Sequence, residues 1–358
     1  MNNPVDNHIG GGGSPDQEQE AENQIIEEFK NLKNDEAHDH IQQRIFALKR
    51  GVNVAKSATD FLGSDVRESL VPLMQNVLRG TIKSMNDGCK ECNILDVMPG
   101  RGTQVDWFLS PELEGNLGKR NNNLYCIETN QEFIKSYKHT VETCSHLKLV
   151  KSYEKKVKDL YQKPLDTKVD FIMCMDLCFL TDDSGQNINP QNDIIDFVKF
   201  LYGQLKPGGA IFITYLDLES PFSKINFDYF DSIKATARKD NFSKIAKARD
   251  DLLYNGKIIN ELKEDEKSCP KVESHKLSTF YYAKTLAEVA IMSLDGGFLK
   301  YNKSKFELDH LKNLIKTVQD EASKKMSKNE KGRFGLCKAE RGRDPLWRVE
   351  SLQYACII

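Results

Sequence analysis

The sequence lacks a long apolar run and an excess of charge of either sign. No stretch approaches the roughly 18 apolar residues that a membrane-spanning helix needs. The N-terminus does not combine a positive start with an apolar core, so no secretory signal is predicted. The 51 Lys and Arg nearly balance the 53 Asp and Glu, whereas a broad nucleic-acid surface needs clustered cations. We therefore expect a cytoplasmic protein that binds neither membranes nor nucleic acid.

The sequence also lacks a recognisable metal-binding pattern. Its nine cysteines lie mostly in apolar segments, and only Cys89 and Cys92 are spaced C-x-x-C. No second pair of Cys or His follows at the spacing of a zinc site. We expect no bound metal, and cysteine usage that suits a reducing compartment.

Apolar segments that alternate between strand and helix periods fill most of the 358 residues. This alternation predicts an α/β fold with a mainly parallel sheet. Residues 1–22 are rich in Gly, Gln and Glu and are predicted to be a disordered tail. The rest is expected to be one domain, divided into an N-terminal helical cap (23–88), a cofactor-binding core (93–220), an inserted helical lid (221–275) and a C-terminal part of the sheet (276–358). The cap can lie over the carboxyl edge of the sheet or pack at its side.

Individual elements follow from the same periodicities. Helices are expected at 25–48, 65–85, 131–143, 194–205, 281–294 and 306–326. Strands are expected at 93–97, 124–128, 147–150, 169–175, 210–215, 298–301 and 347–358, the last as an edge strand. The Lys-Pro-Gly-Gly segment 206–209 is expected to be the turn before the strand at 210–215.

The rest of the chain is organised around one stretch, Asn-Ile-Leu-Asp-Val-Met-Pro-Gly-Arg-Gly-Thr at 93–103. A short apolar run carries an acid, Asp96, and leads into two glycines, Gly100 and Gly102. This pattern is typical of a buried strand that ends in a tight turn before a helix, the corner of a doubly wound sheet that faces a nucleotide.

A second acid decides which nucleotide this turn suits. Glu128 follows the apolar segment 124–127, where a carboxylate can accept hydrogen bonds from both ribose hydroxyls. A dinucleotide site would also use such an acid, but it requires a third glycine in the G-x-G-x-x-G spacing, and none follows Gly102. Asp96 would also repel a pyrophosphate. The combination favours S-adenosylmethionine as the cofactor.

At this point the chain resembles class I methyltransferases, and more closely the histamine N-methyltransferase family. The resembling segments are 127–138, 169–180, 282–301 and, more weakly, 61–85. The resemblance implies a Rossmann-like class I methyltransferase fold, with a mainly parallel seven-stranded sheet flanked by helices, an N-terminal cap and an inserted lid. It also implies transfer of a methyl group to the nitrogen of a small amine by a monomeric enzyme.

The resemblance further implies site residues. Met98, where the family has its first glycine, would contact the cofactor together with Asp96, Gly100, Gly102, Glu128, Phe133 and Met175. Asp176 would orient the amine, with Glu68 opposite it. Phe179 would form part of the surrounding wall, and the substrate amide near the C-terminus of the family falls at Glu350.

Two other hypotheses remain open at this point. Met98 and the changed substrate positions are also compatible with an inactive cofactor- or partner-binding protein. A methyltransferase that acts on a protein or RNA is the other alternative, although no Asn-Pro-Pro-Tyr-like segment follows the strand at 169–175.

Overall fold

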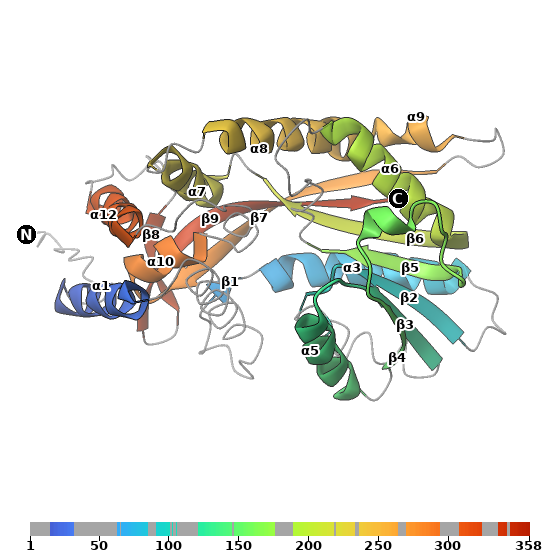
Figure 1. The fold of residues 1–358 in the computed structure, drawn as a ribbon, viewed down its shortest axis with the longest axis horizontal. Coiled ribbons are helices and arrows are strands. Elements are labelled where there is room, and N and C mark those ends of the chain that lie inside the picture. The colour runs from blue at the N-terminus through green and yellow to red at the C-terminus, as the bar shows by residue number, and fades with distance from the viewer. Residues whose placement is uncertain are drawn as a thin grey trace, which may run out of the picture. The chain divides into compact units, whose positions relative to one another are not determined.

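The computed structural model divides into two compact units, each assembled from three separate stretches of chain. Unit 1 comprises 1–65, 219–236 and 280–351, and unit 2 comprises 66–218, 237–279 and 352–358. The structure describes residues 15–31, 63–64, 66–84, 91–100, 102, 105, 121–144, 147–175, 189–217, 220–232, 236–263, 270–293, 308–323, 336–341 and 344–358. Figure 1 shows the elements in each unit, coloured along the chain.

A parallel sheet forms the centre of unit 2. Its strands are β2 (Glu91–Val97), β3 (Asn121–Ile127), β4 (Leu147–Tyr153), β5 (Val169–Cys174) and β6 (Leu205–Leu216). All neighbouring pairs among these five strands run parallel. Two further strands, β7 (Glu273–Ala283) and β9 (Asp344–Ile357), belong partly to each unit. The described residues form a sheet of nine strands, in which these seven are ordered β7-β9-β6-β5-β2-β3-β4 and β9 runs antiparallel to β6.

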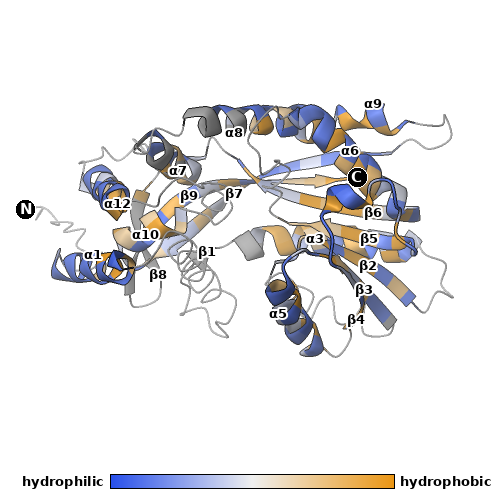
Figure 2. Cartoon of the chain, in the orientation of Figure 1, coloured by the Kyte–Doolittle hydropathy of each residue, from blue (hydrophilic) through white to orange (hydrophobic). Residues whose placement is uncertain are grey.

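Both faces of this sheet are covered, which explains the nearly continuous apolar strands. One face packs against α3 (Val66–Ser84) and α5 (Gln131–Glu142), and the buried Met74 and Tyr137 contribute to that core. The other face packs against α6 (Pro190–Gln204), a π-helical turn (Asp250–Tyr254) and α9 (Ile258–Leu262). Figure 2 shows α5 with apolar residues on one side of a mostly hydrophilic helix. The predicted α/β sheet with helices on both faces is confirmed.

Two predictions about strands in unit 2 are wrong. The last strand, β9, is not at the edge, because it lies between β6 and β7. The 206–209 segment is not a separate turn, because β6 already begins at Leu205 and pairs there with Val169. Gly208 nevertheless has a positive φ of 80°, and the register between β5 and β6 shifts over this segment. The two glycines therefore make a bulge inside the strand.

Helices dominate unit 1. They are α1 (Pro15–Lys30), α7 (Pro221–Ser232), α10 (Leu286–Ser293) and α12 (Leu308–Ser323). Every residue of α10 except Glu288 is buried, and this helix contacts α1, α7 and α12. Two short strands complete the described part of the unit: β1 (Gly63–Ser64) pairs with the end of β7, and β8 (Leu336–Arg341) pairs with the start of β9. No helix in the described ranges is both long and apolar enough to cross a membrane.

The N-terminal helix α1 corrects the predicted disordered tail for residues 15–22. Although this segment is highly polar, its Glu18 carboxylate accepts hydrogen bonds from the Leu286 N–H (2.9 Å) and from Trp347 Nε1 (2.6 Å). Glu22 accepts another from Gln319 (2.9 Å). The buried Ile25 and Phe29 anchor the rest of the helix. Specific tertiary contacts thus order a segment that cannot form a core by itself.

In the predicted lid (221–275), the described residues up to Leu262 are mainly helical, but the helices fall in different units. α7 belongs to unit 1, whereas α8 (Thr236–Arg249) and α9 belong to unit 2. The predicted helix at 281–294 is shorter, since residues up to Ala283 continue β7. The predicted strand at 298–301 lies outside the described residues.

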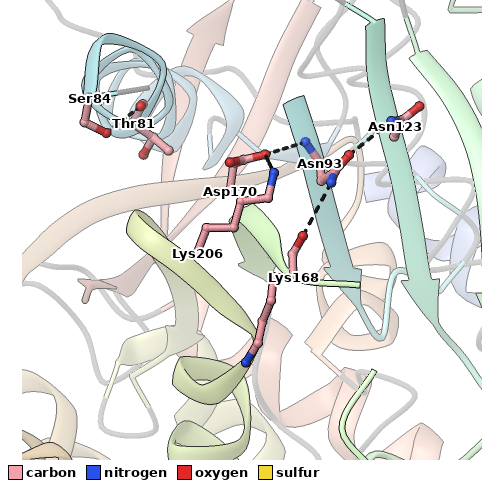
Figure 3. Close-up of polar contacts among 7 residues, drawn as sticks. All are labelled: Thr81, Ser84, Asn93, Asn123, Lys168, Asp170 and Lys206. Atoms are coloured by element: carbon pink, nitrogen blue, oxygen red, sulfur yellow. Dashed lines mark hydrogen bonds and ion pairs between the residues drawn. The ribbon is translucent and has the colours of Figure 1, made fainter. Parts of the chain in front are cut away.

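A polar network joins β2, β3, β5 and the start of β6 in unit 2 (Figure 3). The buried Asp170 carboxylate accepts hydrogen bonds from the Asn93 N–H (2.8 Å) and from Lys206 Nζ (2.8 Å). The Asn93 amide oxygen accepts from Asn123 Nδ2 (3.0 Å). Lys206 belongs to the Lys-Pro-Gly-Gly segment, so this network attaches the bulged start of β6 to the neighbouring strands.

We expect Asp170→Ala to lower the free energy of unfolding by about 2–3 kcal/mol, because it leaves a buried N–H without its acceptor and Lys206 without its counter-ion. Lys206→Met should cost less, under about 1 kcal/mol, since the lysine is one-third exposed and water can replace it. Urea unfolding of both variants tests this order. Equal effects would contradict the central role of Asp170.

Candidate cofactor-binding site

The candidate site lies in unit 2, where two neighbouring parallel strands end. β2 ends at Val97 and leads into the glycine turn, and β3 ends at Ile127, just before Glu128. Because β2 and β3 pair in register up to Val97 and Ile127, both connections leave the sheet at the same edge. The carboxyl edge of a parallel sheet is where ligands of such folds bind.

Glu128 connects these two strand ends. Its Oε2 accepts a hydrogen bond from the Gly100 N–H (3.2 Å). Its Oε1 accepts from the N–H groups of Thr129 (2.7 Å) and Asn130 (2.9 Å). Asn130 is also the N-cap of α5, since its side-chain oxygen accepts from the Glu132 and Phe133 N–H groups. One carboxylate thus fixes the glycine turn and the entry into α5 together.

Met98 adopts a backbone conformation that normally requires glycine. Its φ is +57°, the only positive φ among the described non-glycine residues. Its N–H donates to the Ile127 carbonyl oxygen (2.9 Å), one residue before Glu128. Such strain persists only where the surrounding structure imposes it, and it is most frequent at functional sites. The turn therefore keeps a glycine-like backbone at Met98 despite the larger side chain.

Asp96 is almost completely buried directly before this turn. Its Oδ2 accepts a hydrogen bond from the Tyr137 hydroxyl of α5 (2.9 Å). Burial raises the pKa of Asp96 to about 8, the Tyr137 hydrogen bond opposes this rise, and the nearby charge of Glu128 adds to it. The carboxyl group is consequently mostly protonated at neutral pH in the ligand-free protein.

Gly102 leaves the space that the Tyr137 ring occupies. A Cβ at position 102 would lie 2.7 Å from Tyr137 Cδ2, and φ is +82°. Gly100 also has a positive φ (+57°), but a Cβ there would meet no atom within 4 Å. The two glycines thus have different roles: Gly100 provides a conformation, and Gly102 also allows close packing of the turn on α5.

The remaining predicted site residues are only partly placed. Met175 follows β5 at the same carboxyl edge, is buried, and accepts a weak hydrogen bond at its sulfur from the Thr214 hydroxyl (3.8 Å). Phe133 is half-buried in the first turn of α5. Glu68 belongs to α3, but its side chain lies outside the described residues, as do Asp176 and Phe179 entirely. Glu350 lies in β9 and belongs to unit 1, whereas the cofactor residues belong to unit 2.

Two residues of this site were not predicted from the sequence, Tyr137 and Asn130. Asn130 precedes a helical pattern and is a favoured N-cap residue, which is a usable signal. Tyr137 lies on the apolar face of α5, where its hydroxyl requires a buried partner. Only the fold shows that this partner is Asp96. Within the described ranges, no group of three or more His, Cys, Asp or Glu is arranged to hold a metal ion.

The sequence matches no family model and no curated protein. Among solved structures, a protein of Bacillus halodurans C-125 described as a methyltransferase is 14% identical, with a TM-score of 0.42, and the match covers 81% of this chain and 98% of that one. An S-adenosylmethionine-dependent methyltransferase of Archaeoglobus fulgidus is 19% identical, with a TM-score of 0.27 and coverage of 46% and 61%. The amino pentose methyltransferase CalS10 of Micromonospora echinaspora is 13% identical, with a TM-score of 0.27 and coverage of 45% and 52%.

We expect Gly102→Ala to destabilise unit 2 more than Gly100→Ala. Both substitutions place a Cβ on a left-handed backbone, which costs roughly 1–2 kcal/mol. Only the first also forces a methyl group against Tyr137, which adds about 1–3 kcal/mol. Urea unfolding of the two variants measures the difference, and equal losses would exclude the close packing at Gly102.

The buried Asp96 also predicts a pH dependence of stability. Its pKa is raised on folding, so between about pH 4 and pH 8 the folded state holds a proton that the unfolded state has released. This group therefore makes the protein less stable as pH rises through that window. Asp96→Asn should remove this part of the slope. Unfolding free energies of both proteins at pH 5, 6, 7 and 8 test it, and parallel curves would contradict the assignment.

Proposed function

We propose that unit 2 binds S-adenosylmethionine at the turn after β2 and that the protein transfers the methyl group to the nitrogen of a small amine. The hydrogen bond between Glu128 Oε2 and the Gly100 N–H carries this proposal. This hydrogen bond holds Glu128, which follows β3, against the glycine turn that follows β2. A carboxylate oxygen has two lone pairs, so Oε2 can accept a ribose hydroxyl as well as this N–H.

The charge of the site supports S-adenosylmethionine over a dinucleotide. The ionisable side chains described next to the turn, Asp96 and Glu128, are both acids. The negative charge of Glu128 opposes a pyrophosphate and attracts a sulfonium or ammonium group, and Asp96 can release its proton when a cation binds beside it.

The strand order is a second, independent support. In dinucleotide-binding sheets, the order is 3-2-1-4-5-6 with all strands parallel. Here β4-β3-β2-β5-β6 reproduces the first five positions, and β9 then enters antiparallel between β6 and β7. A mainly parallel sheet of seven strands is the fold that the resemblance to class I methyltransferases implies.

Bound at this site, S-adenosylmethionine supplies an electrophilic methyl group on its sulfonium sulfur. The acceptor nitrogen would approach that carbon in line with the C–S bond and with its lone pair free. The C–N bond would form as the C–S bond breaks, S-adenosylhomocysteine would leave as a neutral thioether, and the methylated nitrogen would lose a proton to water. The protein needs to orient the amine and exclude water. We assign orientation to Asp176 with Glu68, the wall to Phe179, and a cofactor contact to the Met175 backbone.

Two alternative functions predict other results in a methylation assay. An inactive binding protein was suggested by Met98 in place of glycine, but the glycine-like φ of Met98 weakens that argument. A methyltransferase for macromolecules would share the cofactor site and differ only in the acceptor. Incubation with tritiated S-adenosylmethionine and a panel of amines, proteins and RNA separates the three. Methylation of amines supports the proposal, whereas label in protein or RNA alone, or no transfer, contradicts it.

Glu128→Ala should weaken binding of S-adenosylmethionine by well over tenfold, because both the ribose contact and the Gly100 tether are lost. Glu128→Gln keeps one acceptor oxygen and should lose less affinity than Glu128→Ala. Isothermal titration calorimetry measures both variants, with thermal unfolding as a check on the fold. Glu132→Ala, an exposed acid in the first turn of α5, is the matched control and should bind normally. Unchanged affinity in Glu128→Ala would remove the ribose assignment.

A further inference from the structure

Tyr137 is a polar exception on the apolar face of α5. The face is otherwise formed by residues such as Val141, and Tyr137 is completely buried there. Its ring belongs to the core between α5, α3 and the sheet. A phenylalanine would fill the same space without a hydroxyl group to satisfy. The hydroxyl is therefore not explained by packing alone: it donates a hydrogen bond to the Asp96 carboxyl group (2.9 Å).

The same side chain also fixes the glycine turn. The Gly102 Cα faces the Tyr137 ring so closely that no side chain fits between them. The Gly102 N–H donates to the Pro99 carbonyl (3.0 Å), and the Val105 N–H donates to the Gly102 carbonyl (3.0 Å). Contact with Tyr137 thus holds Gly102, which is hydrogen-bonded to Pro99 and Val105.

The groups around Asp96 determine how its charge changes when a cation binds nearby. Tyr137 faces it from α5, Cys126 from β3, and Glu128 from the end of β3. Burial raises the pKa of the Cys126 thiol to about 12 and raises the pKa of Tyr137 well above its ordinary value, so both groups stay neutral near pH 7. Asp96 is therefore the group in this cluster that can change charge when a cation binds beside it.

We propose that Tyr137 is a positioning residue of the methyl-donor site: its hydroxyl holds the Asp96 carboxyl group, and its ring holds the turn at Gly102. This inference rests on the proposed function. Tyr137 thereby contacts both Asp96, before the turn, and Gly102, within it. A cationic donor that binds at the turn favours ionised Asp96, and the Tyr137 hydroxyl stabilises the carboxylate formed when Asp96 releases its proton.

The sharpest test compares Tyr137→Phe with Tyr161→Phe. The first variant keeps the ring at Gly102 and removes only the hydroxyl. The second removes another buried tyrosine hydroxyl in unit 2, which packs with the core on the opposite face of the sheet and has no hydrogen-bond partner among the described residues. Calorimetry with S-adenosylmethionine between pH 6 and about pH 9.5, in two buffers of different ionisation enthalpy, gives both the affinity and the number of protons released.

In the unaltered protein, we expect binding to release close to one proton at pH 7 and about half a proton at pH 8. Loss of a hydrogen bond to a carboxylate corresponds to roughly a tenfold change, or about one pH unit. Tyr137→Phe should therefore bind S-adenosylmethionine about tenfold more weakly at pH 7. The pH at which binding releases half a proton should lie about one unit higher than in the unaltered protein. Asp96→Asn should release no proton, and Tyr161→Phe should match the unaltered protein.

Each other outcome contradicts a specific part of the proposal. If Tyr137→Phe binds normally, or binds weakly without a shifted release curve, Tyr137 has no role beyond packing. Carbon-13 NMR of the aspartate carboxyls in the ligand-free protein separates this failure from that of the proposed function. If no S-adenosylmethionine binds while one aspartate titrates near pH 8 and moves upward in Tyr137→Phe, the Asp96–Tyr137 contact is structural and the proposed function is wrong.

Discussion

The burial of one carboxyl group, that of Asp96, constrains the whole candidate site. A buried acid without a partner would cost several kcal/mol, so the Tyr137 hydroxyl must reach it. This requirement fixes the distance and rotation of α5 relative to β2. The position of α5 in turn leaves no room for a side chain at Gly102. The acid, the helix and the glycine are therefore one arrangement, and a change in any of them affects the other two.

A second constraint comes from parallel strands. In-register pairing makes β2 and β3 end together, so the turn after β2 lies beside the residue that follows β3. Glu128 uses this proximity: one oxygen accepts the Gly100 N–H, and the other accepts two N–H groups at the start of α5. Orphan backbone donors of a turn and of a helix start are thus satisfied by one side chain. The same side chain is the one proposed to accept the ribose.

The sequence predicted those features that depend on local periodicity and chemistry. The five parallel strands, α3, α5 and the juxtaposition of Gly100 with Glu128 follow from apolar patterns and glycine spacing. Features that depend on tertiary contacts could not be predicted from the sequence. The segment at 15–22 is polar enough to suggest disorder, but the hydrogen bonds of Glu18 with Leu286 and Trp347, and of Glu22 with Gln319, order it. β9 has the apolar sequence of a strand, but nothing local indicates that it enters between β6 and β7.

Met98 shows why residue identity and backbone conformation must be considered separately. In the sequence, Met98 is a departure from glycine that argues against a working turn. In the structure, it has the positive φ that a glycine would have, held there by its bond to Ile127 and by the tether between Gly100 and Glu128. The cost of this conformation, on the order of 1–2 kcal/mol, is offset by the contacts on either side. The hydrogen bonds around the turn, more than its glycine count, therefore define its shape.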